Sequence, residues 1–133
     1  MEDIKVIDLK KVKARKIGQG SFATVYKISP KRVVKVFDYH RLGVAIKLIR
    51  DEIKGSKRKD NLPVIDIVNV NRNGKILPAI LKEYLPYRVS LQEINKMPRY
   101  WDKRLANCRK RTRNGKPVLI DTQTRKALRL IGL

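Results

Sequence analysis

The sequence predicts an α+β fold, a five-stranded antiparallel sheet covered by one helix. Short segments rich in β-branched residues come before and after a stretch with helical periodicity. Turn residues separate these segments, and 133 residues are enough for one modest hydrophobic core but too few for two ordinary domains. We therefore expect residues 1–133 to form one domain, with the sheet and helix in residues 1–85 and a shorter region in residues 86–133.

Three strand-like segments precede the helix. Residues 11–18 alternate basic and apolar side chains, which is typical of a strand with one buried face. Residues 23–28 are β-branched and aromatic, and residues 32–37 are rich in valine. A Ser-Pro-Lys turn at residues 29–31 separates the second segment from the third. The pattern predicts three consecutive antiparallel strands.

A helix is predicted from Arg41 to Gly55. Apolar residues recur there at spacings of three and four, and we expect them to form the buried stripe: Leu42, Ala45, Ile46, Ile49 and Ile53. Glu52 falls on the edge of this stripe, so its carboxylate is expected to reach toward the core. Gly55 is a typical residue at a helix end.

Two further strands are predicted after the helix. Residues 64–70 and 75–85 are strand-like, and the Asn73-Gly74 pair between them is a strong tight-hairpin signal. Residues 90–93 have the Ser-x-x-Glu form of a capping box, which predicts a short helix. A second Asn-Gly pair precedes an apolar strand at residues 117–120.

Charge and composition limit the possible partners and compartment. The chain carries 33 Lys and Arg against 12 Asp and Glu, a formal charge of +21, which attracts nucleic acid, acidic protein surfaces and nucleotide phosphates. The single cysteine, Cys108, excludes an internal disulfide and a cysteine-based metal site. No apolar run is long enough to span a bilayer. We expect a cytoplasmic protein with no membrane partner.

A glycine-rich loop and a lysine suggest a phosphate site. Gly18, Gly20 and Ser21 lie between the first two strands, where small residues let backbone N–H groups approach phosphate oxygens; a simple turn is the alternative. Lys35 lies in a valine-rich strand and needs an anionic partner, which Glu52 can supply. The two side chains would either orient the phosphates of ATP or form a purely structural ion pair.

This order of three strands, a helix and two strands resembles the small lobe of the protein-kinase superfamily, here with a strongly reduced C-terminal lobe. Residues 17–26 resemble the glycine-rich loop, residues 33–35 the strand that carries the lysine, and residues 82–85 the hinge. Glu52 resembles the glutamate of the helix. The resemblance implies a nucleotide site made of Ile17, Gly18, Gly20, Ser21, Val25, Val33 and Lys35, with the backbone of Glu83 and Leu85 holding adenine.

The remainder of the chain resembles a catalytic loop and a metal-binding segment. Residues 100–107 match His-Arg-Asp-x-x-x-x-Asn at Asp102 and Asn107, and residues 118–121 resemble the strand that leads into the metal-binding aspartate. By this resemblance Asp102 accepts the proton of the acceptor hydroxyl, Arg104 stabilises the transferring phosphoryl group, and Asn107 and Asp121 hold Mg²⁺. The implied activity is that of an ATP-dependent Ser/Thr protein kinase acting on a protein substrate.

Several positions depart from the kinase pattern. Ala23 replaces the third glycine of the loop, and Lys82 occupies the usually apolar gatekeeper position. The reduced C-terminal lobe lacks the helices that usually bind a peptide. Small kinases of phages and other viruses are the nearest comparison, which would place the protein in the host cytoplasm.

Two other functions remain open. The first is a pseudokinase or kinase mimic that binds and regulates another kinase, because the part that recognises substrate is so short. The second is a basic nucleic-acid-binding module. Its candidate contacts are Lys57, Arg58, Lys59, Tyr100, Trp101, Arg109, Lys110, Arg111, Arg113 and Lys116.

Overall fold

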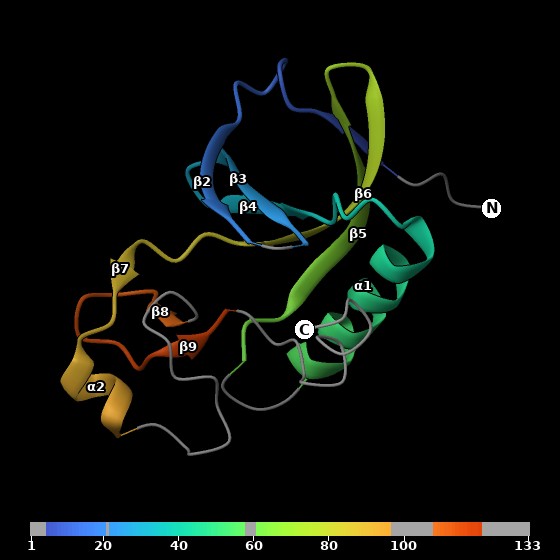
Figure 1. The fold of residues 1–133 in the computed structure, drawn as a ribbon. Helices are drawn as coiled ribbons and strands as arrows, with labels where there is room; N and C mark the ends of the chain where they lie inside the picture. The colour runs from blue at the N-terminus through green and yellow to red at the C-terminus, as the bar shows by residue number, and fades with distance from the viewer. Residues whose placement is uncertain (1–4, 21, 58–60, 97–107, 121–133) are drawn as a thin grey trace.

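The fold consists of a large sheet with one long helix against it and a small sheet beside a short helix (Figure 1). The computed structural model describes residues 5–20, 22–57, 61–96 and 108–120. The small sheet and its helix lie at the end of the molecule away from the tip of the β5–β6 hairpin (Figure 1). The α+β class predicted from the sequence is confirmed.

The large sheet has six strands rather than the predicted five. They are β1 (Val6–Asp8), β2 (Arg15–Gln19), β3 (Thr24–Ser29), β4 (Arg32–Val36), β5 (Val64–Arg72) and β6 (Lys75–Glu83), in the order β1-β5-β6-β4-β3-β2. The five predicted strands are present as antiparallel neighbours. The additional strand, β1, pairs in parallel with β5, and three residues are too few to show periodicity in the sequence.

The first predicted strand begins later than expected. Lys10 and Lys11 donate their backbone N–H groups to the Asp8 carboxylate at 3.0 and 3.3 Å, and Lys13 has a φ of 53°. An aspartate that caps its own downstream backbone in this way forms a turn. Residues 11–13 are therefore a turn, and β2 starts at Arg15.

Helix α1 (Leu42–Ser56) covers one face of the large sheet, but its buried stripe is rotated from the predicted one. The buried residues include Ala45, Leu48, Ile49 and Glu52. Leu42 is 61% exposed and Ile46 is 41% exposed, so their predicted burial is wrong. Because the buried residues Leu48 and Gly55 lie four positions before and three positions after Glu52, Glu52 lies within the stripe rather than on its edge.

The alternation of side chains along β4 divides the core between the two faces of the large sheet. Val34 and Val36 point to the face away from α1 and pack with a cluster on β5, β6 and the segment around β1. On the opposite face Phe37 packs with Leu48 and Ile49 of α1, together with Ile80. Lys35 alternates with Val34 and Val36, so it lies on the face that α1 covers.

The β5–β6 turn has the predicted tight geometry. Asn73 and Gly74 have φ values of 54° and 88°, and the Gly74 N–H donates to Asn71 Oδ1 at 2.8 Å. The left-handed backbone at both positions explains the Asn-Gly pair.

The small sheet consists of β7 (Tyr87–Arg88), β8 (Cys108–Lys110) and β9 (Val118–Leu119), all antiparallel in the order β7-β8-β9. Only β9 was predicted. Helix α2 (Leu91–Asn95) begins with the predicted capping box, since Ser90 and Glu93 exchange hydrogen bonds at 3.1 Å. No helix in the described parts of the chain is long and apolar enough to cross a membrane.

Candidate functional site

Lys35 and Glu52 form a buried ion pair between the large sheet and α1. Lys35 Nζ lies 2.5 Å from Glu52 Oε1, and the Glu52 side chain is fully buried. The predicted contact between these two side chains is confirmed. Burying two charges costs several kcal/mol unless they are paired and hydrogen-bonded, so each of these side chains needs the other at its buried position, and the pair joins β4 to α1.

A second lysine, which the sequence analysis did not connect with Glu52, completes this cluster. Lys82 on β6 lies with its Nζ 3.3 Å from Glu52 Oε2, and it also donates to the backbone carbonyl of Ile120 at 2.8 Å. Its side chain is 3% exposed. The cluster of Lys35, Glu52 and Lys82 is called the two-lysine cluster below. One carboxylate thus serves two lysines, one with each oxygen.

Strand register explains why the two lysines meet. Lys35 lies opposite Ile80 in the β4–β6 pair, and Lys82 lies two residues further along β6. Diagonal neighbours of this kind share a face of the sheet and lie within reach of long side chains. The sequence shows a lysine in each of two apolar strands. Only the pairing of β4 with β6 reveals that these two lysines lie close together.

The predicted phosphate loop connects β2 to β3. The Gly20 N–H donates to the Ala23 carbonyl at 2.8 Å, which forms a tight turn between β2 and β3. A Cβ added at Gly18 or Gly20 would meet no atom closer than 3.8 Å, and neither residue has a positive φ. The fold therefore does not itself require glycine at either position. Ser21 lies outside the described residues.

The predicted apolar lining lies on neighbouring strands. Val25 is opposite Lys35 in the β3–β4 pair, and Gly18 is opposite Val25 in the β2–β3 pair. Val33 precedes Lys35 by two residues and so points to the same face. Ile17 lies at an irregularity in β2 and is partly exposed. The strands thus bring Gly18, Val25, Val33 and Lys35 together on one face.

The predicted hinge is bound to the small sheet by two arginines. Arg109 Nε donates to the Leu85 carbonyl at 2.6 Å, and its Nη2 donates to the Pro86 carbonyl at 3.0 Å. Arg111 Nε lies 3.1 Å from the Glu83 carboxylate. Adenine bound through the Leu85 carbonyl would have to share that acceptor with Arg109.

The remaining predicted site residues lie outside the described part of the chain. They are Asp102, Arg104, Asn107 and Asp121. Their assignment to the acceptor hydroxyl and to Mg²⁺ stays a prediction. Within residues 5–20, 22–57, 61–96 and 108–120, no group of three or more His, Cys, Asp or Glu side chains is placed to hold a metal ion.

The basic cluster near the C-terminus makes many contacts within the chain. Lys110 is buried, and its Nζ contacts the Glu93 carboxylate at 3.1 Å and the Arg113 carbonyl at 2.8 Å. Arg109 and Arg111 bind the hinge as described above. Of the basic residues proposed for nucleic acid in this cluster, Arg111, Arg113 and Lys116 are exposed at the surface.

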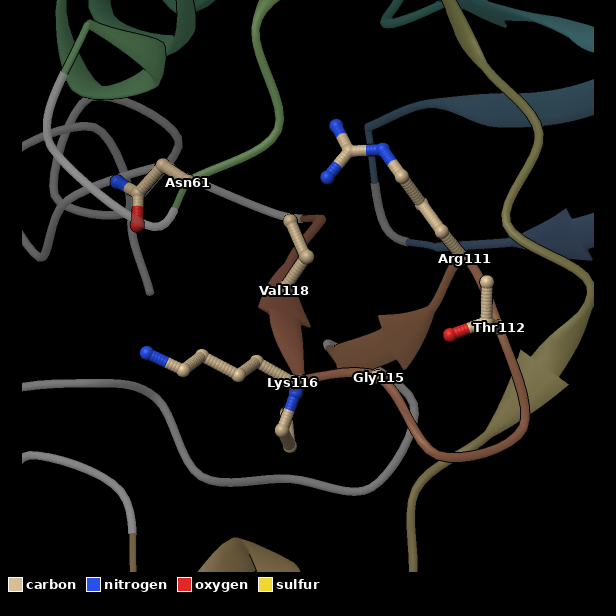
Figure 2. Close-up of a pocket in the computed structure, with 7 residues that line it drawn as sticks. Asn61, Arg111, Thr112, Gly115, Lys116 and Val118 are labelled. Carbon is tan, nitrogen blue, oxygen red and sulfur yellow. The ribbon is translucent and has the colours of Figure 1, made fainter.

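An open hollow of about 480 Å³ lies beside this cluster, between the small sheet and the segment that follows α1. Figure 2 shows Arg111 and Thr112 on one side, Asn61 on the other and Val118 between them. Asn61 Nδ2 donates to the Gly55 carbonyl at 2.8 Å, while its buried Oδ1 has no hydrogen-bond partner among the described residues. The hollow is polar and basic on the Arg111 side.

A second polar network on the other face of the sheet was not predicted. Arg72 Nη1 lies 2.7 Å from Asp38 Oδ2, and Thr24 donates to the same oxygen at 2.8 Å. The hydrogen bond from Arg72 to Asp38 raises the pKa of Arg72 above its ordinary value, with a smaller contribution from Tyr26. This network connects β3 and β5 to the segment after β4, and it lies apart from the two-lysine cluster.

Comparison with models of known protein families gives no match, and a search of curated proteins finds no significant relative.

Proposed function

We propose that this chain is a small ATP-dependent phosphotransferase, a minimal Ser/Thr protein kinase. The observation that carries the proposal is the buried contact of 2.5 Å between Lys35 and Glu52 on the face that also presents Val25 and Val33. A lysine on a central strand paired with a glutamate on the neighbouring helix is the arrangement that orients ATP phosphates in kinases.

The glycine loop supports the same proposal. Gly18 and Gly20 have ordinary backbone conformations and room for a Cβ, so local sterics do not account for them. Close approach of a ligand to the backbone is a separate reason to have glycine at such positions. Phosphate oxygens bound by the loop N–H groups would lie next to Lys35, while Ile17, Val25 and Val33 would contact the base.

The chemical step would depend on residues identified from sequence only. Asp102 would accept the proton of the acceptor hydroxyl, Asn107 and Asp121 would hold Mg²⁺, and Arg104 would neutralise charge on the transferring phosphoryl group. When bound, Mg²⁺ would neutralise negative charge on the phosphates during the transfer. The hydroxyl oxygen of a protein serine or threonine would bond to the γ-phosphorus of ATP while the bond to the β,γ-bridging oxygen breaks, with ADP as the leaving group.

Calorimetry of MgATP binding tests the nucleotide site. We expect binding by the wild-type chain and at least a tenfold weaker affinity for Lys35→Met. Lys75→Met is the matched control. It removes the same charge from an exposed position, the first residue of β6. Absence of binding by the wild-type chain, or equal weakening in both variants, would count against the proposal.

Phosphate transfer is tested separately with labelled ATP and Mg²⁺. We expect labelling of the chain itself or of a Ser/Thr model protein, and a loss of two or more orders of magnitude in rate for Asp102→Asn. If MgATP binds but Asp102→Asn transfers phosphate as fast as the wild-type chain, the assigned base is wrong.

A non-catalytic kinase mimic is the second candidate. It is favoured by the Arg109 contact with the Leu85 carbonyl, which occupies an acceptor at the predicted adenine site. The test is the rate of purified Ser/Thr kinases in the presence of the chain. A mimic would change the rate of the other kinase without binding nucleotide itself. Lys35→Met should therefore change that rate as much as the wild-type chain does.

Binding of nucleic acid is a third candidate, favoured by the basic side of the hollow. The affinity for a single-stranded oligonucleotide should fall with salt, with a slope that reports the number of phosphates neutralised. Lys116→Met should reduce that slope. A salt-independent affinity would exclude an electrostatic interface of this kind.

A further inference from the structure

We propose that Lys82 is a positioning residue that ties the Lys35–Glu52 pair to the small sheet. Its Nζ contacts Glu52 Oε2 in a buried position and the Ile120 carbonyl in a partly buried one. The part of this inference that concerns ligand affinity rests on the proposed function. The part that concerns the connection between the two sheets does not.

The two contacts of Lys82 lie on different parts of the fold. Glu52 belongs to α1, which packs on the large sheet, whereas Ile120 follows β9 of the small sheet. Val118 and Ile120 pack with Leu62 and Leu85, so an apolar contact accompanies the hydrogen bond from Lys82 to the carbonyl. Lys82 is thus the polar centre of the junction between β6, α1 and the end of β9.

The choice of partners distinguishes positioning from simple charge balance. Lys35 already provides Glu52 with a cation at 2.5 Å, so neutralising the carboxylate does not require a second lysine. A buried ammonium group has three donors in need of acceptors, and Lys82 directs one of them to a backbone carbonyl. The Ile120 carbonyl carries no net charge, so this hydrogen bond does not serve to balance charge. It holds the end of β9 in place instead.

The arrangement has a consequence for Lys35. Because the two oxygens of Glu52 are held by different lysines, rotation of the carboxylate would break both contacts at once. Removing Lys82 takes away the contact at Glu52 Oε2, so one of the contacts that fix the carboxylate torsion is lost and the position of the Lys35 ammonium becomes less defined. Affinity for phosphate groups depends on that position, since misplaced charge loses much of its interaction energy.

The test compares Lys82→Met with a matched variant, Lys110→Met. Lys110 is also a buried lysine bound to one carboxylate, that of Glu93, and one backbone carbonyl, that of Arg113. Both variants should lower the melting temperature. MgATP affinity, measured well below both melting temperatures, should fall at least tenfold in Lys82→Met and less than twofold in Lys110→Met, and Lys82→Arg should recover most of the loss. Equal affinities in Lys82→Met and Lys110→Met would overturn the ligand half of the inference.

Hydrogen exchange without nucleotide separates this inference from the proposed function. Amides of the segment from Val118 to Ile120 should exchange at least tenfold faster in Lys82→Met than in the wild-type chain, and no faster in Lys110→Met once overall stability is matched with urea. If the wild-type chain fails to bind MgATP, the proposed function is lost and this measurement alone decides the role of Lys82. Unchanged protection of the segment in Lys82→Met would show that Lys82 does not connect the sheets. If Lys82→Met does not fold, Lys82→Gln provides the same comparison with a neutral polar side chain.

Discussion

Replacing Glu52 by glutamine removes the only negative charge of the two-lysine cluster among the described residues while keeping its size. Glutamine retains one carbonyl acceptor, so one lysine keeps a hydrogen bond to residue 52, but both lysines lose their charge–charge attraction to that residue. Glu52 is fully buried and the Lys35 and Lys82 side chains are 11% and 3% exposed. The perturbation therefore occurs where solvent cannot replace the lost interaction.

The expected loss of stability follows from this burial. Removing one partner of a buried ion pair typically costs 3–5 kcal/mol, because the other charge is left in an apolar region. Lys82 retains the Ile120 carbonyl and glutamine retains an acceptor, so we expect the lower end, about 3 kcal/mol. For a chain of this size each 1 kcal/mol lowers the melting temperature by roughly 3 °C, so the expected shift is about 10 °C.

Urea unfolding of Glu52→Gln and Glu83→Gln provides the comparison. Glu83 pairs with Arg111 at 3.1 Å, but the side chains are 33% and 50% exposed, so Glu83→Gln should cost less than about 1 kcal/mol. A double-mutant cycle with Lys35→Met should give a coupling energy of about 2 kcal/mol between Lys35 and Glu52. If Glu52→Gln lies within 1 kcal/mol of Glu83→Gln, the cluster does not stabilise the fold in the way described.

Two other perturbations should change stability away from the site. The Ser90 backbone N–H, and then the Lys110 ammonium, lower the pKa of Glu93 below its ordinary value of 4.5. The ionised Glu93 carboxylate therefore stabilises the fold above pH 4.5 and loses this effect as the pH falls through its lowered pKa. The difference in unfolding free energy between the wild-type chain and Glu93→Gln should shrink in acid. A difference that stays constant with pH would contradict this. Gly74→Ala should cost about 1 kcal/mol in urea unfolding, because Gly74 has a φ of 88°, and should leave MgATP affinity unchanged.

The contacts of the predicted hinge bear on the role of the basic residues near the C-terminus. Arg109 and Arg111 bind Leu85, Pro86 and Glu83, while Lys82 binds Ile120. Arg109 and Arg111 therefore attach the small sheet to the end of β6 and the segment that follows it. This reading explains part of the formal charge of +21 without a nucleic-acid ligand.

The sequence alone determined those features that depend on local patterns. Alternation and β-branched content located β3, β4, β5 and β6. The Asn73-Gly74 pair located the hairpin between β5 and β6, and Ser90 with Glu93 located the start of α2. Helical phase selected Glu52 as a residue that faces the core, which led directly to its contact with Lys35. Each of these patterns repeats over several residues or requires a particular backbone conformation, so it can be recognised without knowing the fold.

Only the tertiary structure decided the features that depend on distant pairing. Strands β1, β7 and β8 are two or three residues long, and β1 forms by pairing with β5 far along the chain. The same holds for Lys82, whose role depends on the register of β4 with β6 and on the arrival of Ile120 from the small sheet. Leu42 and Ile46 illustrate the converse: they have the spacing of a buried stripe, but the position of α1 on the sheet leaves them exposed. Local sequence sets which residues can be buried, whereas the packing of elements against one another determines which of them are.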